Sequence, residues 1–266
     1  MEIVALMKQT PDTAQLSQRM DGLKLMAKGG PRIVNPWDEY ALEAGIRLVE
    51  EHGGVCTILS MGKPETMEAL KTGLAMGGKK TKAVFLGDPK FENSDSLCTA
   101  RILAKAIQKV GDVSIVLAGK SAIDGDTANT AVQVAALLGM PYLGYVVEIK
   151  EVNVEEKTIT VVRALEKGRE TVTTTLPAVL SVLKELGEPR YASFMGIRKA
   201  AKAKIPRWGA KTLGLSPNEI GANGSLVAWP DVSLPPVKDA NLEIIEGEPD
   251  EVAKVLADKL LAEKVI

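Results

Sequence analysis

Short apolar runs alternate with amphipathic segments along the first half of this 266-residue chain. Four runs have the length of buried strands, at residues 2–7, 55–61, 82–87 and 112–119. The segments between them carry helical spacing or helix-end residues, at residues 35–54, 63–78, 94–110 and 126–139. Asp126 or Thr127 is expected to cap the last helix. Strands joined by helices of this length predict an α/β fold, doubly wound, with a mostly parallel sheet covered on both faces.

The pattern changes in the second half of the chain. Residues 142–153, 157–168 and 169–183 are β-rich and separated by turn residues, which predicts strands that extend or flank the sheet. Residues 206–249 are punctuated by Pro and Gly and show little periodicity, as does a long loop that ends near Val34. The chain ends in an amphipathic segment with the spacing of a helix. We therefore predict a domain over 1–205 and a C-terminal arm with a final helix over 206–266.

Composition narrows the possible functions. The net charge is −1, so no general attraction to nucleic acid or to an anionic membrane is expected. No run approaches the roughly 18 to 20 apolar residues of a membrane span, and the N-terminus lacks the apolar region of a signal peptide. Cys56 and Cys98 have no metal-binding spacing, which predicts reduced core thiols in a cytoplasmic protein. The only histidine, His52, stands at a predicted helix end, so a histidine-based nucleophile or metal site is not expected.

The stretch "LAGKSAIDGDTANT" (117–130) follows a predicted strand and opens a predicted helix. Ligands of parallel sheets bind beyond the carboxyl ends of the strands, where free N–H groups of a helix favour an anion. Asp124 and Asp126 have the chemistry to cap those N–H groups or to bind a ribose hydroxyl. A nucleotide site and a capped loop without ligand fit this pattern equally well. No P-loop, GxGxxG or "SGGxDS" motif occurs, which favours holding a nucleotide over hydrolysing one.

A second stretch, "GEPRYASFMGIRKAAKAKI" (187–205), sets apolar residues among many cations. In one interpretation it forms an ordinary helix, with Phe194, Ile197 and Ala201 facing the core. In the other, Phe194 is a hydrophobic anchor offered to another protein, and the surrounding positive charge attracts an acidic partner surface.

Several motifs occur in order along nearly the whole chain: "KQTPDT", "NPWDEYALEAGIRL", "GLAMGG", "GKSAIDGDTANT", "VVRALEKGRETVTTTLPAVLSV" and "EPRYASFMGIRKAAKAK". Together they resemble the β subunit of electron-transfer flavoprotein. The resemblance implies an electron carrier without bond-making chemistry of its own, paired with an α subunit that binds most of an FAD. It also implies electron uptake from an acyl-CoA dehydrogenase or another flavin dehydrogenase, delivery to a quinone reductase or another acceptor, and an AMP held in this subunit.

The resemblance also implies site residues. The nucleotide would contact the following positions: Leu6, Asn35, Pro36, Trp37, Asp38, Met61, Gly119, Ala122, Ile123, Asp124, Gly125, Asp126, Thr127 and Thr130. Thr13 would approach the flavin of the α subunit. The dehydrogenase would be gripped by a docking segment that includes Arg190, Tyr191, Phe194, Met195, Ile197 and Lys199. No catalytic or metal-binding residue is implied, and the C-terminal arm would reach over the α subunit.

The chain departs from the family pattern at two places, and two alternatives follow. Ala164 stands after Arg163 where many relatives carry an acid, and "ASFMGIRKA" replaces the commoner "ASLPNIMKA", so the choice of partner can differ. Electron-bifurcating members hold a second FAD in place of AMP and often read "DGDTAQVGPQ"; this chain reads "DGDTANTAVQ", which favours AMP. The alternative from another class is a stand-alone nucleotide-binding or nucleotide-hydrolysing protein, which leaves "EPRYAS" and the arm unexplained.

Overall fold

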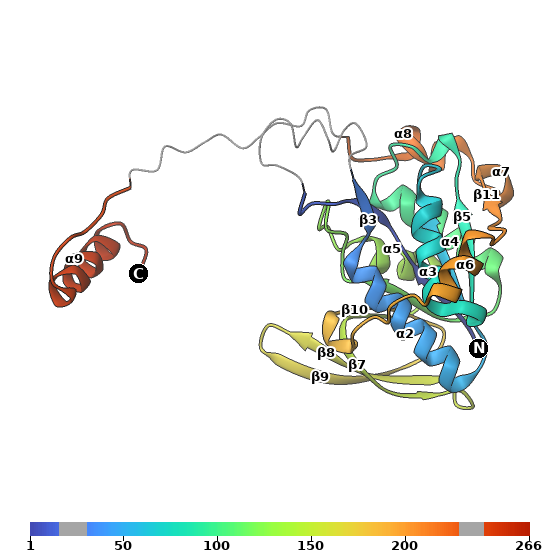
Figure 1. The fold of residues 1–266 in the computed structure, drawn as a ribbon, viewed down its shortest axis with the longest axis horizontal. Coiled ribbons are helices and arrows are strands. Elements are labelled where there is room, and N and C mark those ends of the chain that lie inside the picture. Colours follow the sequence, from blue (N-terminus) through green and yellow to red (C-terminus); the bar gives the residue numbers. More distant parts are fainter. Residues whose placement is uncertain (16–30, 229–241) are drawn as a thin grey trace. The chain divides into compact units, whose positions relative to one another are not determined.

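The computed structural model describes residues 1–15, 31–228 and 242–266, and its centre is a nine-stranded sheet (Figure 1). The strand order is β11-β5-β4-β1-β6-β10-β7-β8-β9. The bounds of the strands are β1 Glu2–Leu6, β4 Val55–Met61, β5 Thr81–Leu86, β6 Val113–Gly119, β7 Tyr142–Asn153, β8 Thr158–Leu165, β9 Gly168–Thr175, β10 Ala178–Val182 and β11 Arg207–Trp208. The strands from β11 to β7 are paired in parallel, and β7, β8 and β9 are antiparallel.

The order of the strands reverses at β1. The chain runs from β1 through β4 to β5 on one side, and then returns to place β6 on the other side of β1. In sheets of this kind a crevice opens at the carboxyl ends of the strands where the order reverses. A ligand site is therefore expected at the ends of β1 and β6.

Helices cover both faces of the sheet, as the alternating pattern predicts. Their bounds are α2 Pro36–His52, α3 Thr66–Gly77, α4 Ser96–Val110 and α5 Thr130–Leu138. One hydrophobic core lies beneath α2 and α3 and includes Leu42, Ile46 and Leu70, and Figure 1 views the molecule from this side. The second lies beneath α4 and α5 and includes Ile107 and Val134. The predicted doubly wound α/β fold is confirmed.

The β-rich extension is confirmed, with a division that the sequence pattern did not predict. The segment expected as one strand over residues 169–183 forms two strands, β9 and β10, and Pro177 lies between them. Because β8 and β9 are paired, Arg163 stands opposite Glu170, and Arg163 Nη1 lies 2.8 Å from Glu170 Oε1. Arg163 and Glu170 of the stretch "VVRALEKGRETVTTTLPAVLSV" are therefore a cross-strand ion pair.

Two predictions of local structure were wrong. The loop expected up to Val34 contains a two-stranded antiparallel ladder of β2 (Gln9–Pro11) and β3 (Arg32–Val34), whose three-residue strands are too short to show a period of two. The helix expected from residue 126 begins at Thr130. Asp126 and Ala128 have positive φ angles of 45° and 52°, which a right-handed helix does not accommodate.

The chain divides into two compact units, residues Met1–Val232 and Ser233–Ile266. The described part of the region after residue 205 includes β11, α7 (Ala210–Leu213) and α8 (Gly221–Gly224) within the first unit. Leu213 and Ile220 are buried in the core beneath α4, so this region has a partner in the chain itself, which weak periodicity did not reveal. The described residues of the second unit include α9 (Pro249–Ala262), the final helix that the sequence predicts.

The structure buries both cysteines and places His52 at the end of a helix. Cys56 and Cys98 are free and buried, and burial raises the pKa of Cys56 to about 12, so that thiol stays protonated and unreactive. His52 occupies the last turn of α2, as predicted. Within residues 1–15, 31–228 and 242–266, no three His, Cys, Asp or Glu side chains are grouped to hold a metal ion. Over the same ranges no helix is long and apolar enough to cross a membrane.

Candidate functional site

The candidate site is built where β1 and β6 end, at the point of strand-order reversal. Lys8 follows β1, Asn35 and Asp38 open α2, and the loop from Gly119 to Thr130 follows β6. Leu6 and Met61 are the last residues of β1 and β4. The fold therefore brings segments that are far apart in sequence to one edge of the sheet.

Asn35 holds the loop after β6 to the start of α2. Its Nδ2 donates a hydrogen bond of 2.8 Å to the carbonyl oxygen of Ser121, and its Oδ1 accepts one of 3.2 Å from the N–H of Ile123. The backbone N–H of Asn35 donates to the carbonyl of Lys8, over 2.8 Å. Asn35 is buried and makes no side-chain cap on α2. Its side chain thus shapes the site from within.

Asp38, in the first turn of α2, also binds backbone groups at the site. Its Oδ2 accepts a hydrogen bond of 2.7 Å from the N–H of Lys8, and its Oδ1 accepts one of 3.1 Å from the N–H of Gly119. The carboxylate therefore joins the ends of β1 and β6 at the first turn of α2. Burial raises the pKa of Asp38 to about 7, against the lowering effect of these two N–H groups.

We expect Asp38 to make stability depend on pH. The folded chain keeps the proton of Asp38 up to about pH 7, whereas the unfolded chain releases it near the ordinary value of 3.8. The contribution of Asp38 is therefore complete below that ordinary value and is lost as pH rises through the folded pKa. Relative to Asp38→Asn, which cannot titrate, the free energy of unfolding of the wild type should fall by about 3 kcal/mol between pH 5 and pH 8. Urea denaturation of both chains measures this difference, and a constant difference would contradict it.

The loop from Gly119 to Thr130 is held by charged groups and has an unusual backbone. Lys8 Nζ lies 2.8 Å from Asp124 Oδ2, and Ser121 donates a hydrogen bond to Asp126. The left-handed φ angles of Asp126 and Ala128 are uncommon for residues other than glycine and mark a conformation fixed by its surroundings. Asn129 precedes α5 without a side-chain cap, which leaves first-turn N–H groups suited to an anion.

The other residues predicted to contact the nucleotide lie in the loop after β6 and in the first turn of α2. Ala122, Ile123, Gly125, Thr127 and Thr130 lie in the loop or at its end, and Pro36 and Trp37 are the first residues of α2. Lys120 Nζ lies 4.6 Å from the centre of the Trp37 ring, a cation–π contact that spans the same crevice. Thr13 is exposed in the turn after β2.

Among the residues that the structure describes, the buried side-chain polar atoms without a hydrogen-bond partner are Thr10 Oγ1, Ser60 Oγ and Gln133 Oε1. Thr10 belongs to β2, Ser60 precedes the last residue of β4, and Gln133 belongs to α5. Ser60 faces the core beneath α2 and α3, as Ile58 does, whereas α5 covers the other face of the sheet, so the three atoms do not line one site. These three residues carried no signal in the sequence, because an unpaired polar atom is visible only in three dimensions. The fit to a nucleotide phosphate rests instead on the uncapped first turn of α5.

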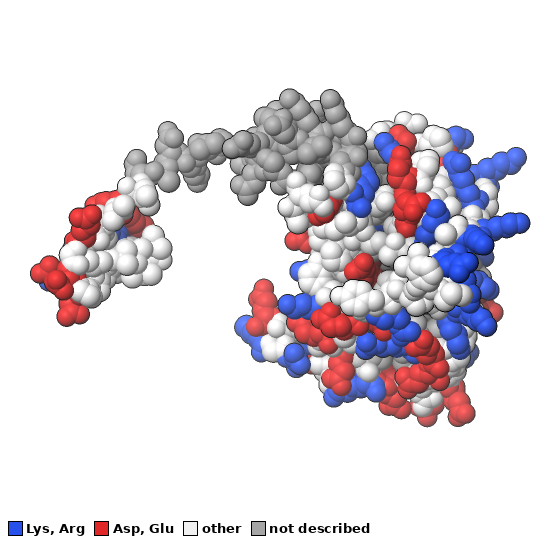
Figure 2. All heavy atoms as spheres, viewed as in Figure 1, with Lys and Arg blue, Asp and Glu red and all other residues white. Residues whose placement is uncertain are grey.

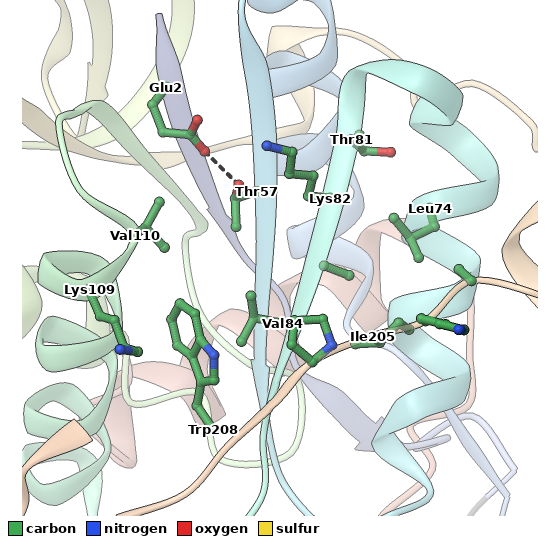
Figure 3. A pocket seen from close by; sticks show the side chains of 14 residues that line it. Glu2, Thr57, Leu74, Thr81, Lys82, Val84, Lys109, Val110, Ile205 and Trp208 are labelled. Carbon is green, nitrogen blue, oxygen red and sulfur yellow. Dashed lines mark hydrogen bonds between the residues drawn. The ribbon is translucent and has the colours of Figure 1, made fainter. Parts of the chain in front are cut away.

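Two cavities lie elsewhere. One, of about 480 Å³, is lined by the first residues of β1 and β5 together with Lys109, Lys204 and Trp208 (Figure 3). The other, of about 730 Å³, includes Met1, Val113 and Pro177. Both lie toward the amino ends of the parallel strands. They are therefore separate from the candidate nucleotide site.

The docking segment contains α6 (Phe194–Ala201), which exposes its large apolar residues. Tyr191, Phe194, Met195 and Ile197 are 100%, 73%, 56% and 53% exposed. The buried residues of α6 are Gly196 and Ala200, and a Cβ at Gly196 would collide with the carbonyl oxygen of Ala75 in α3. The interpretation as a core helix with Phe194, Ile197 and Ala201 inward is wrong. Small residues face α3 instead, which turns the large ones outward.

Arg190 occupies a different environment from the other predicted docking residues. Its guanidinium binds Glu43 and Glu50 of α2, with Nε 2.9 Å from Glu43 Oε2 and Nη1 2.7 Å from Glu50 Oε1. Lys199 is exposed on α6. The sequence pattern did not predict that Arg190 pairs with Glu43 and Glu50. Their spacing of seven residues places both on one face of the helix and could have indicated a shared partner.

Comparisons with known proteins agree on one family. The model of the Electron transfer flavoprotein domain matches residues 23–213. The chain is 38% identical over 269 residues to "Electron transfer flavoprotein subunit beta" of Thermoanaerobacterium thermosaccharolyticum, with both chains covered completely. It is 38% identical over 267 residues to "Caffeyl-CoA reductase-Etf complex subunit CarD" of Acetobacterium woodii, again over all of both chains. It is 34% identical to "Protein FixA" of Bradyrhizobium diazoefficiens, over 98% of this chain and 91% of the relative.

Proposed function

The chain belongs to the electron transfer flavoprotein family as a beta subunit, and from this we propose that it holds a structural AMP and docks a flavin dehydrogenase onto the complex. Beta subunits of this family pair with an alpha subunit and work in electron transfer. In our proposal the complex binds FAD, most of it in the alpha subunit. Electrons come from an acyl-CoA dehydrogenase or another flavin dehydrogenase and go to a quinone reductase or another acceptor. We expect this chain to act in the cytoplasm and to supply no bond-making chemistry itself.

The observation that carries the AMP proposal is the uncapped first turn of α5, directly after the loop that follows β6. Asn129 makes no side-chain cap there, so the N–H groups at the start of α5 are available to a phosphate. Asn35 and Asp38 would not bind the nucleotide with their side chains, because these are already hydrogen-bonded within the protein. Their role would be to fix the loop that does.

The AMP proposal is tested by counting nucleotides in the native complex with the alpha subunit. We expect one FAD and one AMP per heterodimer, released by denaturation and measured by absorbance and mass. Asp124→Ala removes the ion pair with Lys8 that ties the loop to the end of β1, so the variant should retain several-fold less AMP. The FAD content of this variant should stay at one per heterodimer. Unchanged AMP in the variant would contradict the role of Asp124.

Two FAD and no AMP would support the alternative of an electron-bifurcating complex. The motif "DGD" at residues 124–126, which bifurcating members share, is the observation that favours it. A stand-alone nucleotide-binding protein is disfavoured by similarity over the whole chain to subunits of complexes. Stable, colourless homodimers that bind nucleotide and do not combine with an alpha subunit would support that class instead.

The docking proposal depends on the exposed apolar side chains of the docking segment. Tyr191, Phe194, Met195 and Ile197 lie next to a surface of exposed cations that includes Lys79, Lys80, Arg198, Lys199, Lys202 and Lys204 (Figure 2). An aromatic anchor beside positive charge suits a partner with an apolar pocket and an acidic rim. "Caffeyl-CoA reductase-Etf complex subunit CarD" is named for a complex with a reductase of a CoA ester, which supports a partner that acts on CoA esters. The C-terminal arm, with the exposed apolar residues Val255, Leu256 and Leu261 of α9, is proposed to pack on the alpha subunit.

A further inference from the structure

The segment before α6 is held to α2 by one arginine. Arg190 donates from Nε and Nη2 to Glu43, over 2.9 and 3.2 Å, and from Nη1 and Nη2 to Glu50, over 2.7 and 2.8 Å. Its backbone N–H also donates to Glu43 Oε2, over 3.1 Å. Glu43 and Glu50 lie two turns apart on the same face of α2, and a planar guanidinium can bind both carboxylates at once.

This cluster is partly buried and includes a second arginine. The side chain of Glu43 is 4% exposed, and Arg47 Nε lies 2.7 Å from its Oε1. Burial raises the pKa of Glu43, but hydrogen bonds from Arg190 and Arg47 lower it by more than burial raises it. The net pKa is therefore lowered, and the carboxylate stays charged. Arg47 also donates to the carbonyl oxygen of Glu188, over 3.1 Å. The charge of Glu43 is thus neutralised by arginines from the helix and from the segment.

Few other contacts fix residues 188–192. Among the described residues, the hydrogen bonds that join this segment to the rest of the chain all involve Glu43, Arg47 or Glu50. The next support is α6 itself, which rests on α3 through the small residues Gly196 and Ala200. This contact brings the backbone of α6 close to α3. The chain that leads into α6 is held to α2 by the hydrogen bonds of Arg190 and Arg47.

We propose that Arg190 is a positioning residue, which fixes the direction in which α6 presents Phe194 and does not itself touch the partner. The inference rests on the proposed docking function and gives it a mechanism. It also assigns a double role to α2. The helix carries Asp38 at the nucleotide site and Glu43 and Glu50 at the docking segment, so one rigid element links the two places.

The test is a double-mutant cycle in the native complex with the alpha subunit. Arg190→Gln, Glu50→Gln and the double variant are assayed with the flavin dehydrogenase that reduces the wild-type complex fastest in a panel of acyl-CoA dehydrogenases. Glu50 is preferred to Glu43 because its side chain is 45% exposed, so its replacement leaves no buried orphan. We expect each single variant to raise KM for the dehydrogenase about tenfold, with kcat and FAD content unchanged. The double variant should be no worse than Arg190→Gln alone.

A direct contact between Arg190 and the partner predicts a different pattern. Glu50→Gln would then be neutral in both backgrounds, which would overturn the inference. Arg190→Lys adds a second comparison, because lysine keeps the charge but cannot bind two carboxylates as a fork. Positioning predicts that Arg190→Lys behaves like Arg190→Gln; a direct charge contact predicts a nearly normal KM. Hydrogen exchange at residues 188–193 should rise in Arg190→Gln and Glu50→Gln, in the absence of any partner.

A control comes from α4, which covers the opposite face of the sheet. Lys105 is exposed there and makes no ion pair with the residues that the structure describes, so Lys105→Gln should change KM less than threefold and leave hydrogen exchange at residues 188–193 unchanged. Phe194→Ala separates this inference from the docking proposal. If Phe194→Ala raises KM while the Arg190 and Glu50 variants do not, positioning is wrong and docking stands. If Phe194→Ala has no effect, the docking proposal fails and the inference fails with it.

Discussion

Replacement of Phe194 by alanine is expected to raise KM for the electron-donating dehydrogenase by about 30-fold, which corresponds to about 2 kcal/mol. The ring is 73% exposed in this chain, so it gains its main apolar contacts only when a partner covers it. Aromatic residues that enter a partner's pocket are the side chains whose truncation costs most at interfaces. The measurement is the steady-state reduction of the native complex at several dehydrogenase concentrations.

The fold should tolerate this change. Removal of an exposed ring leaves no internal cavity, and alanine is a better helix former than phenylalanine. FAD and AMP content and Tm should therefore match the wild type. Phe194→Leu should retain most of the affinity, because leucine supplies an apolar anchor of similar reach. Val154→Ala, at a residue 50% exposed in the turn between β7 and β8, serves as the control for loss of an exposed apolar group. A normal KM for Phe194→Ala would contradict the docking role.

The sequence pattern predicted those elements whose burial follows a simple period. Strands β1, β4, β5 and β6 are buried on both faces and therefore appear as unbroken apolar runs, and α2 and α4 have the spacing of helices that cover a sheet. The β2–β3 ladder was missed because its strands are three residues long and widely separated in sequence. Residues 206–228 were assigned to the arm because short elements with small buried faces have no detectable period.

The sequence pattern predicted which loops form the candidate site, but not what the side chains of these loops bind. The motifs pointed to the loops after β1 and β6, and the fold brings these loops together. That Asn35 and Asp38 contact the nucleotide stays a prediction; their side chains bind backbone groups of Ser121, Ile123, Lys8 and Gly119. A sequence shows that a polar residue stands near a site and cannot show which way it turns. The same limit applies to Arg190, whose charge suggested a partner but whose guanidinium faces α2.

Gly119→Ala is expected to have the largest effect at the nucleotide site. A Cβ at this last residue of β6 would lie 2.5 Å from Trp37 Cβ and 2.6 Å from both Trp37 C and Asp38 Oδ1. Two of these three atoms are a backbone carbon and the carboxylate oxygen that binds the N–H of Gly119 itself, so a rotamer change at Trp37 gives no relief. The first turn of α2 must move away from β6, at a cost of about 3 kcal/mol.

Two measurements follow from this displacement. Tm of the chain should fall by roughly 9 °C, because each kcal/mol lowers Tm by about 2 to 4 °C in proteins of similar size. AMP content of the complex should fall to less than about a tenth of the wild-type value, because the loop after β6 is aligned by the same contacts. FAD content should change much less, since most of the FAD site is proposed to belong to the alpha subunit.

Gly125→Ala is the matched control for Gly119→Ala. Gly125 lies in the same loop, its φ is outside the left-handed region, and a Cβ there would meet no atom within 4 Å. The two variants add the same methyl group six residues apart, and only one of them separates α2 from β6. If both lose AMP equally, the loop itself and not its packing against α2 governs nucleotide binding. If only Gly119→Ala does, the site depends on how closely the first turn of α2 approaches β6, and AMP retention becomes a measure of that contact.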